Sequence, residues 1–472
     1  MEKKQIKQEV RVRFAPSPTG TMHVGTARTA LFNFLFAKKY GGKMVLRIED
    51  TDKERSKKEY EDDILEGLKW LSISYDELYR QSDRTAVYKK YLEQLIASGA
   101  AKETIEENQI IPPGAHVKKI TPRLESVIRF NNPNKTVTFH DIIRGDISFD
   151  TTELGDFVIA KDLETPLYNL AVVADDFDMG ITHIIRGEDG ISNTPRQILI
   201  QEALGAPRPL YAHIPFILAP DRSKLSKRHG AVSVTEYRNL GFLPEALVNF
   251  LALIGWNPGD EREIFSLEEL AKEFTLEKVQ KGGAIFNVEK LRWMNGEYLK
   301  NMPIAEFKKR ALEYVPDSIR TLPGFNKKRF DAVLAIIGER MSTFKDIAAM
   351  AEQGEIGYYF VAPEYLKEKL LWKPARAHSA DGEESDFVKT KKRLEQTINI
   401  LKTVEEKSFT AEKTKEALWD YATEEGRGFV LWPMRMALSG KDKSPDPFVL
   451  AEVLGKNETI QRLLLAGKKC DA

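Results

Sequence analysis

The sequence predicts an α/β fold with a parallel sheet in the first half of the chain and helices in the second half. Residues 10–14 alternate apolar and charged side chains, as a short strand does, and stop at Pro16-Ser17-Pro18. Apolar residues then recur at helical spacing from Gly25 to Lys39, and a compact apolar strand follows at 44–48. Strand, turn, helix and strand in this order form a βαβ unit, which predicts a nucleotide-type crevice beside the sheet.

The next elements are predicted from capping residues and periodicity. Gly41-Gly42 is expected to end the first helix. We predict that Ser56 caps a second helix and that Ser82 caps a third, which closes at Gly99. Residues 101–160 then change to short β-like pieces separated by Pro and Asn turns, so we expect an inserted α+β module there.

Predicted strands and helices alternate again after the insert, which indicates that the first domain resumes there. We expect a helix near 168–174, a strand at 184–185, a helix after 193–195 and a strand at 214–218. After about residue 240 the periodicity is almost wholly helical. The prediction is therefore a parallel-sheet domain that carries an insert and is followed by an all-helical region.

Composition limits the class of protein. The 472 residues contain 71 Lys plus Arg and 71 Asp plus Glu, so the formal net charge is zero and a polyanion would need local basic patches. The only cysteine, Cys470, excludes an intrachain disulfide and a cysteine-based zinc site. There is no apolar signal core and no stretch long enough to span a membrane, so we expect a cytoplasmic protein.

Two segments carry chemistry. In APSPTGTMHVGT, residues 15–26, a glycine-containing turn precedes a helix, so backbone N–H groups and the helix dipole favour a phosphate there, and His23 can add a donor. In DRSKLSKRHG, residues 221–230, lysines could neutralise the charge that develops on a triphosphate during nucleotidyl transfer. Taken singly, each segment is more typical of an exposed surface loop.

Together the two segments resemble the paired motifs of class I aminoacyl-tRNA synthetases. His23-Val24-Gly25-Thr26 is similar to a HIGH-type motif, and KLSKR at 224–228 is similar to a KMSKS-type motif. The resemblance to bacterial glutamyl-tRNA synthetases extends over about the first 300 residues, through RFAPSPTG, FNFLFAKKYGGKMVLRIEDTD, RGEDGISNTPRQ and FNVEKLRWMNGEYL. WPMRMAL at 432–438 resembles the helical anticodon-binding region of that family more loosely.

The resemblance implies a domain organisation. A Rossmann-type parallel-sheet catalytic domain is expected at 1–100 and 166–240, with the KMSKS-type loop in its second half. An inserted acceptor-stem-binding module is expected at 101–165. A helical stem-contact domain is expected at 241–324 and a helical anticodon-binding domain at 325–472. The partners implied are L-glutamate and tRNA, with no membrane, and the family suggests a monomer.

The resemblance also implies a pocket for glutamate. Arg13 would grip the side-chain carboxylate with a fork that lysine cannot imitate. Glu49 would meet the ammonium, Tyr168 would close one side, and Arg186 would pair with a carboxylate. Ala15 and Ser17 would line the same pocket. Without the family, each of these residues is more typical of a core or surface position.

A neighbouring pocket for ATP is implied in the same way. His23 and Lys227 would be the catalytic residues, and the ATP-binding set would be His23, Gly25, Asp189, Leu225, Ser226 and Lys227. The glutamate carboxylate attacks the α-phosphorus itself, so no Ser, Cys or His nucleophile is needed. Mg²⁺ would share the pyrophosphate charge, and no metal-ligating residues are assigned. A terminal ribose hydroxyl of tRNA then attacks the adenylate carbonyl.

Three departures from the family pattern matter. Thr26 stands where the general motif has a second histidine. Gly190 stands where the family has a bulky side chain, so we expect room in the pocket that another group must fill. The insert is short and lacks the cysteines with which some relatives bind zinc, so His116 and His140 are expected to be surface residues and no zinc is expected.

The predicted function is ATP-dependent ligation of L-glutamate to tRNA(Glu) through glutamyl-adenylate. An enzyme that also glutamylates tRNA(Gln) stays open as an alternative. Glutamine-specific relatives show PPEPNG in place of APSPTG, so this segment favours glutamate as the amino acid. A paralogue that glutamylates a modified tRNA base ends soon after the basic loop, whereas about 240 residues follow it here. A regulatory protein without catalysis is disfavoured because His23, Glu49, Arg186 and Lys227 are all present.

Overall fold

A computed structural model gives the fold. The structure describes residues 9–108, 123–230, 232–372 and 383–471, without the side chains of 106–108, 123–125, 227 and 383–385. The chain divides into two compact units, Met1–Asn295 and Gly296–Ala472. No helix in the described ranges is long and apolar enough to cross a bilayer.

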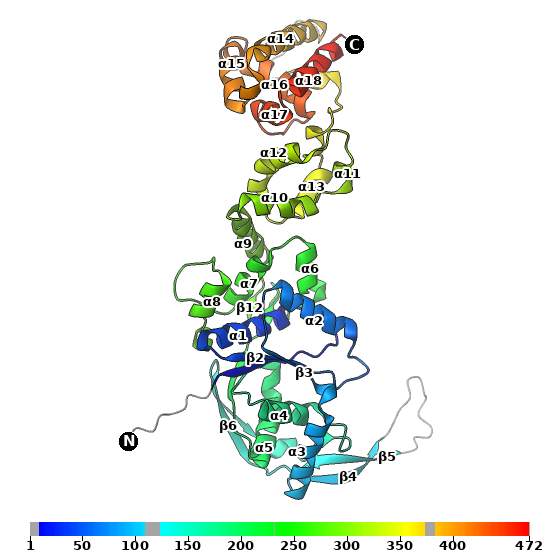
Figure 1. Cartoon of the computed structure of the whole chain (residues 1–472), viewed down its shortest axis with the longest axis vertical. Coiled ribbons are helices and arrows are strands. Elements are labelled where there is room, and N and C mark those ends of the chain that lie inside the picture. Colours follow the sequence, from blue (N-terminus) through cyan, green and yellow to red (C-terminus); the bar gives the residue numbers. More distant parts are fainter. Residues whose placement is uncertain (1–8, 109–122, 231, 373–382, 472) are drawn as a thin grey trace. The chain divides into compact units, whose positions relative to one another are not determined.

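The first unit is built around a seven-stranded sheet with the order β3-β2-β1-β9-β10-β6-β7 (Figure 1). Neighbouring strands are parallel except for β7, which is antiparallel to β6. This confirms the predicted parallel sheet, in which five of the six residues of β2 are buried. The strands are β1 (Arg11–Phe14), β2 (Lys43–Ile48), β3 (Glu77–Arg80), β6 (Thr136–Asp141), β7 (Gly145–Asp150), β9 (His183–Gly187) and β10 (Leu210–Ile214).

Helices cover both faces of this sheet. In Figure 1, α1 lies on one side of the sheet, and α3, α4 and α5 lie on the other side. The apolar residues predicted in α1 are buried, and Gly41 ends the helix at a φ of 62°, a left-handed conformation that favours glycine. The helices of this unit are α1 (Val24–Tyr40), α2 (Lys58–Trp70), α3 (Thr85–Ala97), α4 (Tyr168–Asp178), α5 (Thr194–Leu204), α6 (Val234–Asn239), α7 (Pro244–Leu253) and α8 (Leu267–Glu273).

Several local predictions were wrong. Ser56 is not a cap, because α2 begins after Lys57, whose side chain makes no capping bond. Ser82 lies in a 3-10 turn, where its amide and hydroxyl donate to Asp50 instead of capping α3. The edge strand β3 was not predicted, because its four side chains are all half-buried and show no alternation. A two-residue strand, β12 (Ala284–Ile285), pairs with β11 (Ile217–Leu218) within the region expected to be helical.

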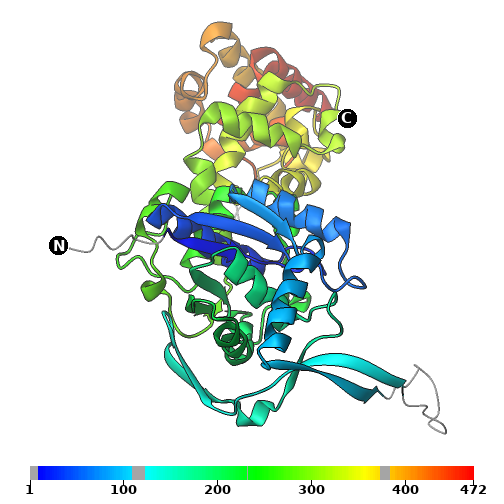
Figure 2. The same ribbon diagram turned by 60° about the horizontal axis from the view of Figure 1, so that its bottom comes forward.

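The expected insert is only partly a separate module. Strands β4 (Ala101–Asn108), β5 (Arg123–Phe130) and β8 (Phe157–Ala160) form their own antiparallel sheet, in which β4 and β5 extend away from the main sheet (Figure 2). Strands β6 and β7, however, join the main sheet through β10. Alternating burial in β6 fits either sheet, so periodicity alone could not assign the strand.

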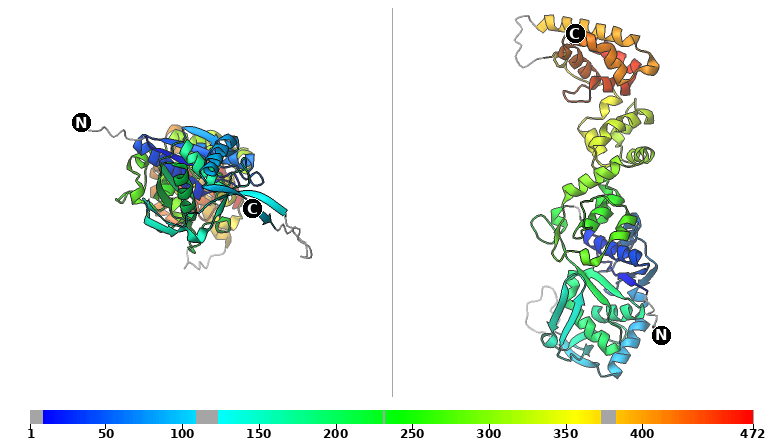
Figure 3. Two further views of the ribbon diagram at one scale, coloured as in Figure 1. Left: turned by 90° about the horizontal axis from the view of Figure 1, so that it is seen from below. Right: turned by 90° about the vertical axis from the view of Figure 1, so that its left-hand side faces the viewer.

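The second unit is helical. Helices α14, α16 and α18 pack against one another, and α15 packs on α16 and α17, so that the orange to red helices form one bundle (Figure 3). Helix α9 (Val288–Lys300) contains the boundary between the units. The remaining helices are α10 (Ile304–Glu313), α11 (Asp317–Arg320), α12 (Lys327–Ile337), α13 (Asp346–Glu352), α14 (Glu383–Thr403), α15 (Ala411–Glu424), α16 (Arg427–Ser439), α17 (Pro447–Leu454) and α18 (Lys456–Lys469).

Candidate active site

One cavity of about 770 Å³ lies in the first unit, where β1, β2, β9 and β10 end and α1 begins. This is the edge of a parallel sheet at which ligands bind in open α/β folds. The side chain of Lys227 lies outside the described part of the chain. The other predicted site residues all line the cavity: Arg13, Ala15, Ser17, His23, Gly25, Glu49, Tyr168, Arg186, Asp189, Leu225 and Ser226.

Backbone hydrogen bonds join the histidine turn to residues 232–234, which follow the second motif. Val24 N donates to Val232 O at 2.8 Å, and Val234 N donates to Met22 O at 2.9 Å. From α2, the Asp63 carboxylate accepts from the amide of Met22 and from the hydroxyl of Thr235. The histidine turn is therefore fixed to the segment that directly follows the basic loop.

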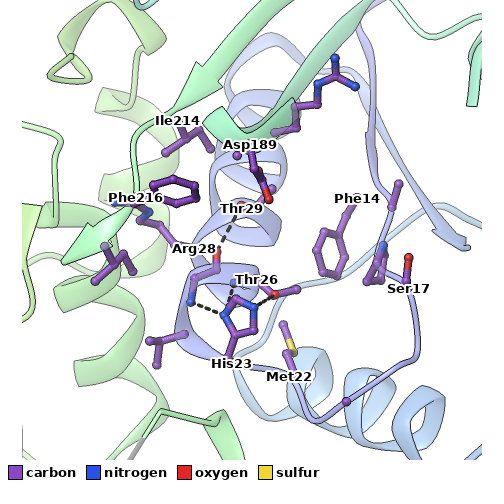
Figure 4. Close-up of a pocket in the computed structure, with 18 of the residues that line it drawn as sticks. Phe14, Ser17, Met22, His23, Thr26, Arg28, Thr29, Asp189, Ile214 and Phe216 are labelled. Atoms are coloured by element: carbon purple, nitrogen blue, oxygen red, sulfur yellow. Dashed lines mark hydrogen bonds between the residues drawn. The ribbon is translucent and has the colours of Figure 1, made fainter. Parts of the chain in front are cut away.

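His23 is the N-cap of α1 (Figure 4). Its Nδ1 accepts from the amides of Gly25 and Thr26 at 3.1 and 3.2 Å, so its proton is carried on Nε2. Nε2 lies 2.9 Å from the Thr26 hydroxyl, which accepts that proton. Burial, followed by the charge of Lys224, lowers the pKa of His23, so the imidazole is neutral and Nε2 is its donor.

A buried chain of charges supports one end of the cavity. Asp176 Oδ1 accepts from Arg13 Nε at 3.2 Å and from Arg47 Nη1 at 2.7 Å, and Arg47 Nη2 donates to Glu49 Oε1 at 3.0 Å. Among the described residues, the terminal nitrogens of Arg13 and Oε2 of Glu49 have no hydrogen-bond partner. Burial raises the pKa of Glu49 although Arg47 opposes this. A guanidinium fork and a carboxylate oxygen thus remain for a ligand.

Arg186 is 8% exposed and is held by neutral groups. Its Nη1 donates to Gln197 at 2.9 Å, and Nη2 donates to the carbonyl of Gly190 and the hydroxyl of Thr194. Its Nε donates to His213 Nε2 at 3.0 Å. None of these four partners is a carboxylate, so the positive charge at the cavity wall is available to a ligand anion.

The room expected at Gly190 is filled. A Cβ atom at this position would lie 2.4 Å from Nε and 2.8 Å from Cδ of Arg186. The missing side chain therefore leaves no gap, because Arg186 occupies the space and is the group that was expected to fill it. Glycine is what lets the guanidinium approach the Gly190 carbonyl.

The basic loop is folded onto β11 beside the cavity. Leu225 N donates to Ile217 O at 3.1 Å, and the amide of Ser226 donates to His229 Nδ1 at 3.2 Å. The Lys224 ammonium lies 4.3 Å from the centroid of the Phe216 ring, which is a cation–π contact. Lys224, Leu225 and Ser226 line the cavity, so the loop presents backbone and cationic groups to it.

The described residues contain no group of three or more His, Cys, Asp or Glu side chains arranged for a metal ion. His140 is exposed and hydrogen-bonded to Asp146 at 2.7 Å, as a surface residue would be. His116 lies outside the described residues.

Some residues that line or support the cavity were missed. They include Arg28, which donates to the carbonyls of Pro215 and Ile254, and the Arg47–Asp176 pair. A signal existed, since Arg47 interrupts an apolar strand and Asp175-Asp176 interrupts an apolar helix. Charged residues inside apolar runs are buried only when they are paired with an opposite charge. The sequence could therefore have predicted that Arg47 pairs with Asp175 or Asp176.

The chain matches a family model described as tRNA synthetases class I (E and Q), catalytic domain, over residues 9–111 and 101–293. A second model, described as an anticodon binding domain, matches residues 305–466. The parallel sheet with the cavity at its edge fits the first model, and the helical unit fits the second. The fold and the site therefore define a class I tRNA synthetase of the E and Q group.

Proteins of similar sequence and structure identify the family within this class. The chain is 42% identical to glutamate–tRNA ligase 2 of Thermoanaerobacter pseudethanolicus, over 96% of this chain and 97% of that protein. It is 41% identical to the glutamate–tRNA ligase of Aquifex aeolicus, over 97% of this chain and 98% of that protein. The chain also resembles a crystal structure of a glutamate tRNA ligase from Elizabethkingia meningosepticum in complex with its amino acid. The two match with a TM-score of 0.83 and 32% sequence identity, over 98% of this chain and 99% of that chain. The chain belongs to the glutamate–tRNA ligase family.

Proposed function

We propose that this protein ligates L-glutamate to tRNA(Glu) in two steps. In the first step a glutamate carboxylate oxygen attacks the α-phosphorus of ATP, which forms glutamyl-adenylate and releases pyrophosphate. In the second step a hydroxyl of the terminal tRNA ribose attacks the adenylate carbonyl and releases AMP. The observation that carries the proposal is that an arginine fork, a carboxylate, a capped helix N-terminus and a basic loop all line one cavity.

The residue roles belong to the same proposal. Arg13 binds the side-chain carboxylate through its unpaired nitrogens, and Glu49 binds the ammonium through Oε2. Arg186 meets a substrate carboxylate, while Tyr168, Ala15 and Ser17 complete this end of the pocket. ATP lies along His23, Gly25, Asp189, Leu225 and Ser226, and Lys227 stabilises the charge that develops on the phosphates.

The remaining features of the proposal concern partners. Mg²⁺ enters as part of the ATP substrate, because the phosphates and waters supply most of its oxygen ligands. The part of the chain at 101–165 contacts the acceptor end, 241–324 contacts the stem and 325–472 binds the anticodon. We propose a cytoplasmic monomer.

Transfer of labelled glutamate to purified tRNA(Glu) tests the proposal. We expect charging that requires ATP, Mg²⁺ and tRNA, with glutamine as an inactive amino acid control. Pyrophosphate exchange should be measured with tRNA present, so that a tRNA-dependent activation step is not missed. Absence of both charging and exchange would refute the proposal, and a parallel assay with tRNA(Gln) would decide the alternative.

A further inference from the structure

Three residues stand in a row across adjacent strands behind the cavity wall. Arg186 on β9 lies beside His213 on β10, and Asp141 ends β6, the next strand. His213 and Asp141 are both 0% exposed and do not line the cavity, whereas Arg186 does. Nothing in the proposed chemistry uses this buried pair.

Asp141 is saturated as a hydrogen-bond acceptor. Its Oδ1 accepts from the amides of Ile143 and Arg144 at 3.0 and 2.9 Å. Its Oδ2 accepts from the amide of His213 at 3.0 Å and lies 2.7 Å from His213 Nδ1. Burial alone would raise the pKa of Asp141, but the hydrogen bonds from His213 and the two amides lower it. The carboxylate is therefore ionised and can only accept, so His213 Nδ1 carries a proton.

The other ring nitrogen faces a donor. Arg186 Nε lies 3.0 Å from His213 Nε2, and a guanidinium has hydrogens but no lone pair to offer. The Thr194 hydroxyl lies 3.3 Å from the same nitrogen and donates its proton to the Gly190 carbonyl. His213 Nε2 must therefore accept, which makes the imidazole neutral with its proton on Nδ1. Burial and the nearby Arg186 charge lower the pKa of His213, although Asp141 opposes this, which is consistent with a neutral ring.

We propose that His213 and Asp141 are positioning residues that aim the Arg186 guanidinium at a substrate carboxylate, which rests on the proposed glutamate ligase function. Asp141 selects the imidazole tautomer, the imidazole accepts from Nε, and Nη1 and Nη2 are fixed by Gln197, Gly190 and Thr194. All three nitrogens of Arg186 are thus held before glutamate arrives, which lowers the entropy lost on binding.

The same geometry makes glutamate binding sensitive to acid. Protonation of His213 would place an N–H group against the N–H group of Arg186 and add a second positive charge. Four ionisable groups surround the imidazole of His213: Asp141, Arg186, Arg144 and Tyr211. Arg144 donates to the His213 carbonyl, and the Tyr211 ring is nearly parallel to the imidazole, with 6.1 Å between the ring centroids. Only His213 in this set changes charge near neutral pH.

The test compares His213→Leu with His213→Gln, using charging of tRNA(Glu) by the full-length protein. Leucine removes the acceptor for Arg186 Nε, so we expect the KM for glutamate to rise about ten- to hundredfold, with the KM for ATP changed less than about threefold. Glutamine places a carboxamide oxygen near the former Nε2 position, so it should restore most of the affinity. His183→Leu, a half-buried histidine on β9 outside the cavity lining, is the matched control.

A pH series separates positioning from a purely structural role. In the wild type, the KM for glutamate should rise as the pH is lowered below the ordinary titration range of histidine, because the pKa of His213 is lowered, whereas in His213→Gln this rise should be absent. An unchanged KM for glutamate in His213→Leu would overturn the inference. So would equal losses in both variants together with a raised KM for ATP, because they indicate a general defect in folding.

The tautomer gives a readout that does not depend on activity. In protein labelled with ¹⁵N-histidine, the resonance that disappears in His213→Gln should report a neutral ring protonated on Nδ1. A ring protonated on Nε2 would overturn the inference whether or not the protein charges tRNA. Failure of the wild type to charge tRNA with an Nδ1-protonated ring would instead refute the proposed function and, with it, the substrate that Arg186 is proposed to meet.

Discussion

At the scale of single residues, three buried arginines around one cavity differ in the hydrogen bonds they leave free. Arg47 is surrounded by the carboxylates of Glu49, Asp175 and Asp176, so it is structural. Arg13 is held through Nε alone and keeps its two terminal nitrogens for a ligand. Arg186 has neutral partners only and keeps its net charge. Ligand specificity therefore depends on the free donors and on unneutralised charge rather than on the number of arginines.

Arg13→Lys should chiefly impair glutamate selection. Lysine offers neither the planar fork nor an Nε–H for Asp176, so the kcat/KM for glutamate should fall about 10- to 100-fold in charging assays. The KM for ATP should change little. Arg11→Lys is the control, because Arg11 lies on the same strand but pairs with Glu77 away from the cavity. An Arg13→Lys enzyme with wild-type specificity would contradict the role given to the fork.

Lys227→Ala should act on the rate of activation rather than on affinity. The lysine is proposed to stabilise phosphate charge that develops only in the transition state, so pyrophosphate exchange should slow by about 100-fold or more. The KM for glutamate should stay within about threefold, as uniform binding is not affected. Lys272→Ala, an exposed lysine on α8, provides the comparison. Equal rates in the two variants would disprove the assignment.

At the scale of elements, the start of α1 has two uses at once. The His23 imidazole satisfies two amides that the first helical turn leaves unpaired, and the same turn lines the cavity. Both uses depend on the neutral ring with its proton on Nε2, which the Thr26 hydroxyl accepts. Thr26 thus takes the position of the second motif histidine by partnering the first.

Two substitutions at His23 should separate these uses. His23→Ala removes the cap and should lower the free energy of unfolding by about 1 kcal/mol as well as the rate of exchange. His23→Asn keeps a capping oxygen, so its stability should be close to that of the wild type while exchange stays slow. Denaturant unfolding and pyrophosphate exchange measure the two effects. Recovery of the rate in His23→Asn would show that the histidine is only a cap.

At the scale of the whole molecule, a zero net charge coexists with a polyanionic partner in the proposed function. Such a protein has no long-range attraction for RNA, so affinity must come from basic surfaces that contact phosphates directly. The chain also separates into two compact units, and the two family models divide between them at nearly the same place. The cavity belongs wholly to the first unit.

Salt should therefore affect the two kinds of substrate differently. Raising the salt concentration from about 50 to 200 mM should increase the KM for tRNA about tenfold or more, because counterions compete at each phosphate contact. The KM for glutamate should change much less, since Arg13 and Arg186 are buried and poorly screened. Parallel charging assays measure both constants. A KM for tRNA that is independent of salt would contradict binding through local basic patches.

Local periodicity was sufficient for much of the fold. The β1-α1-β2 unit, the helical second half and the glycine stop at Gly41 were predicted because each depends on neighbouring residues. The Ser56 and Ser82 caps failed because α2 and α3 begin after Lys57 and Arg84, and β3 was missed because its four half-buried side chains show no alternation. The sheet that receives β6 depends on contacts with β10, which lies about 70 residues further along the chain.

The sequence by itself determined the family, the parallel sheet and eleven of the residues that line the cavity, because motifs and periodicity depend on residues close together in the chain. Only the tertiary structure decided how those residues are held. The Asp176 bridge between Arg13 and Arg47, the filling of Gly190 by Arg186 and the His213–Asp141 pair each join distant segments. These arrangements could not be predicted from neighbouring residues, because a buried charge is stable only where other strands and helices bring it partners.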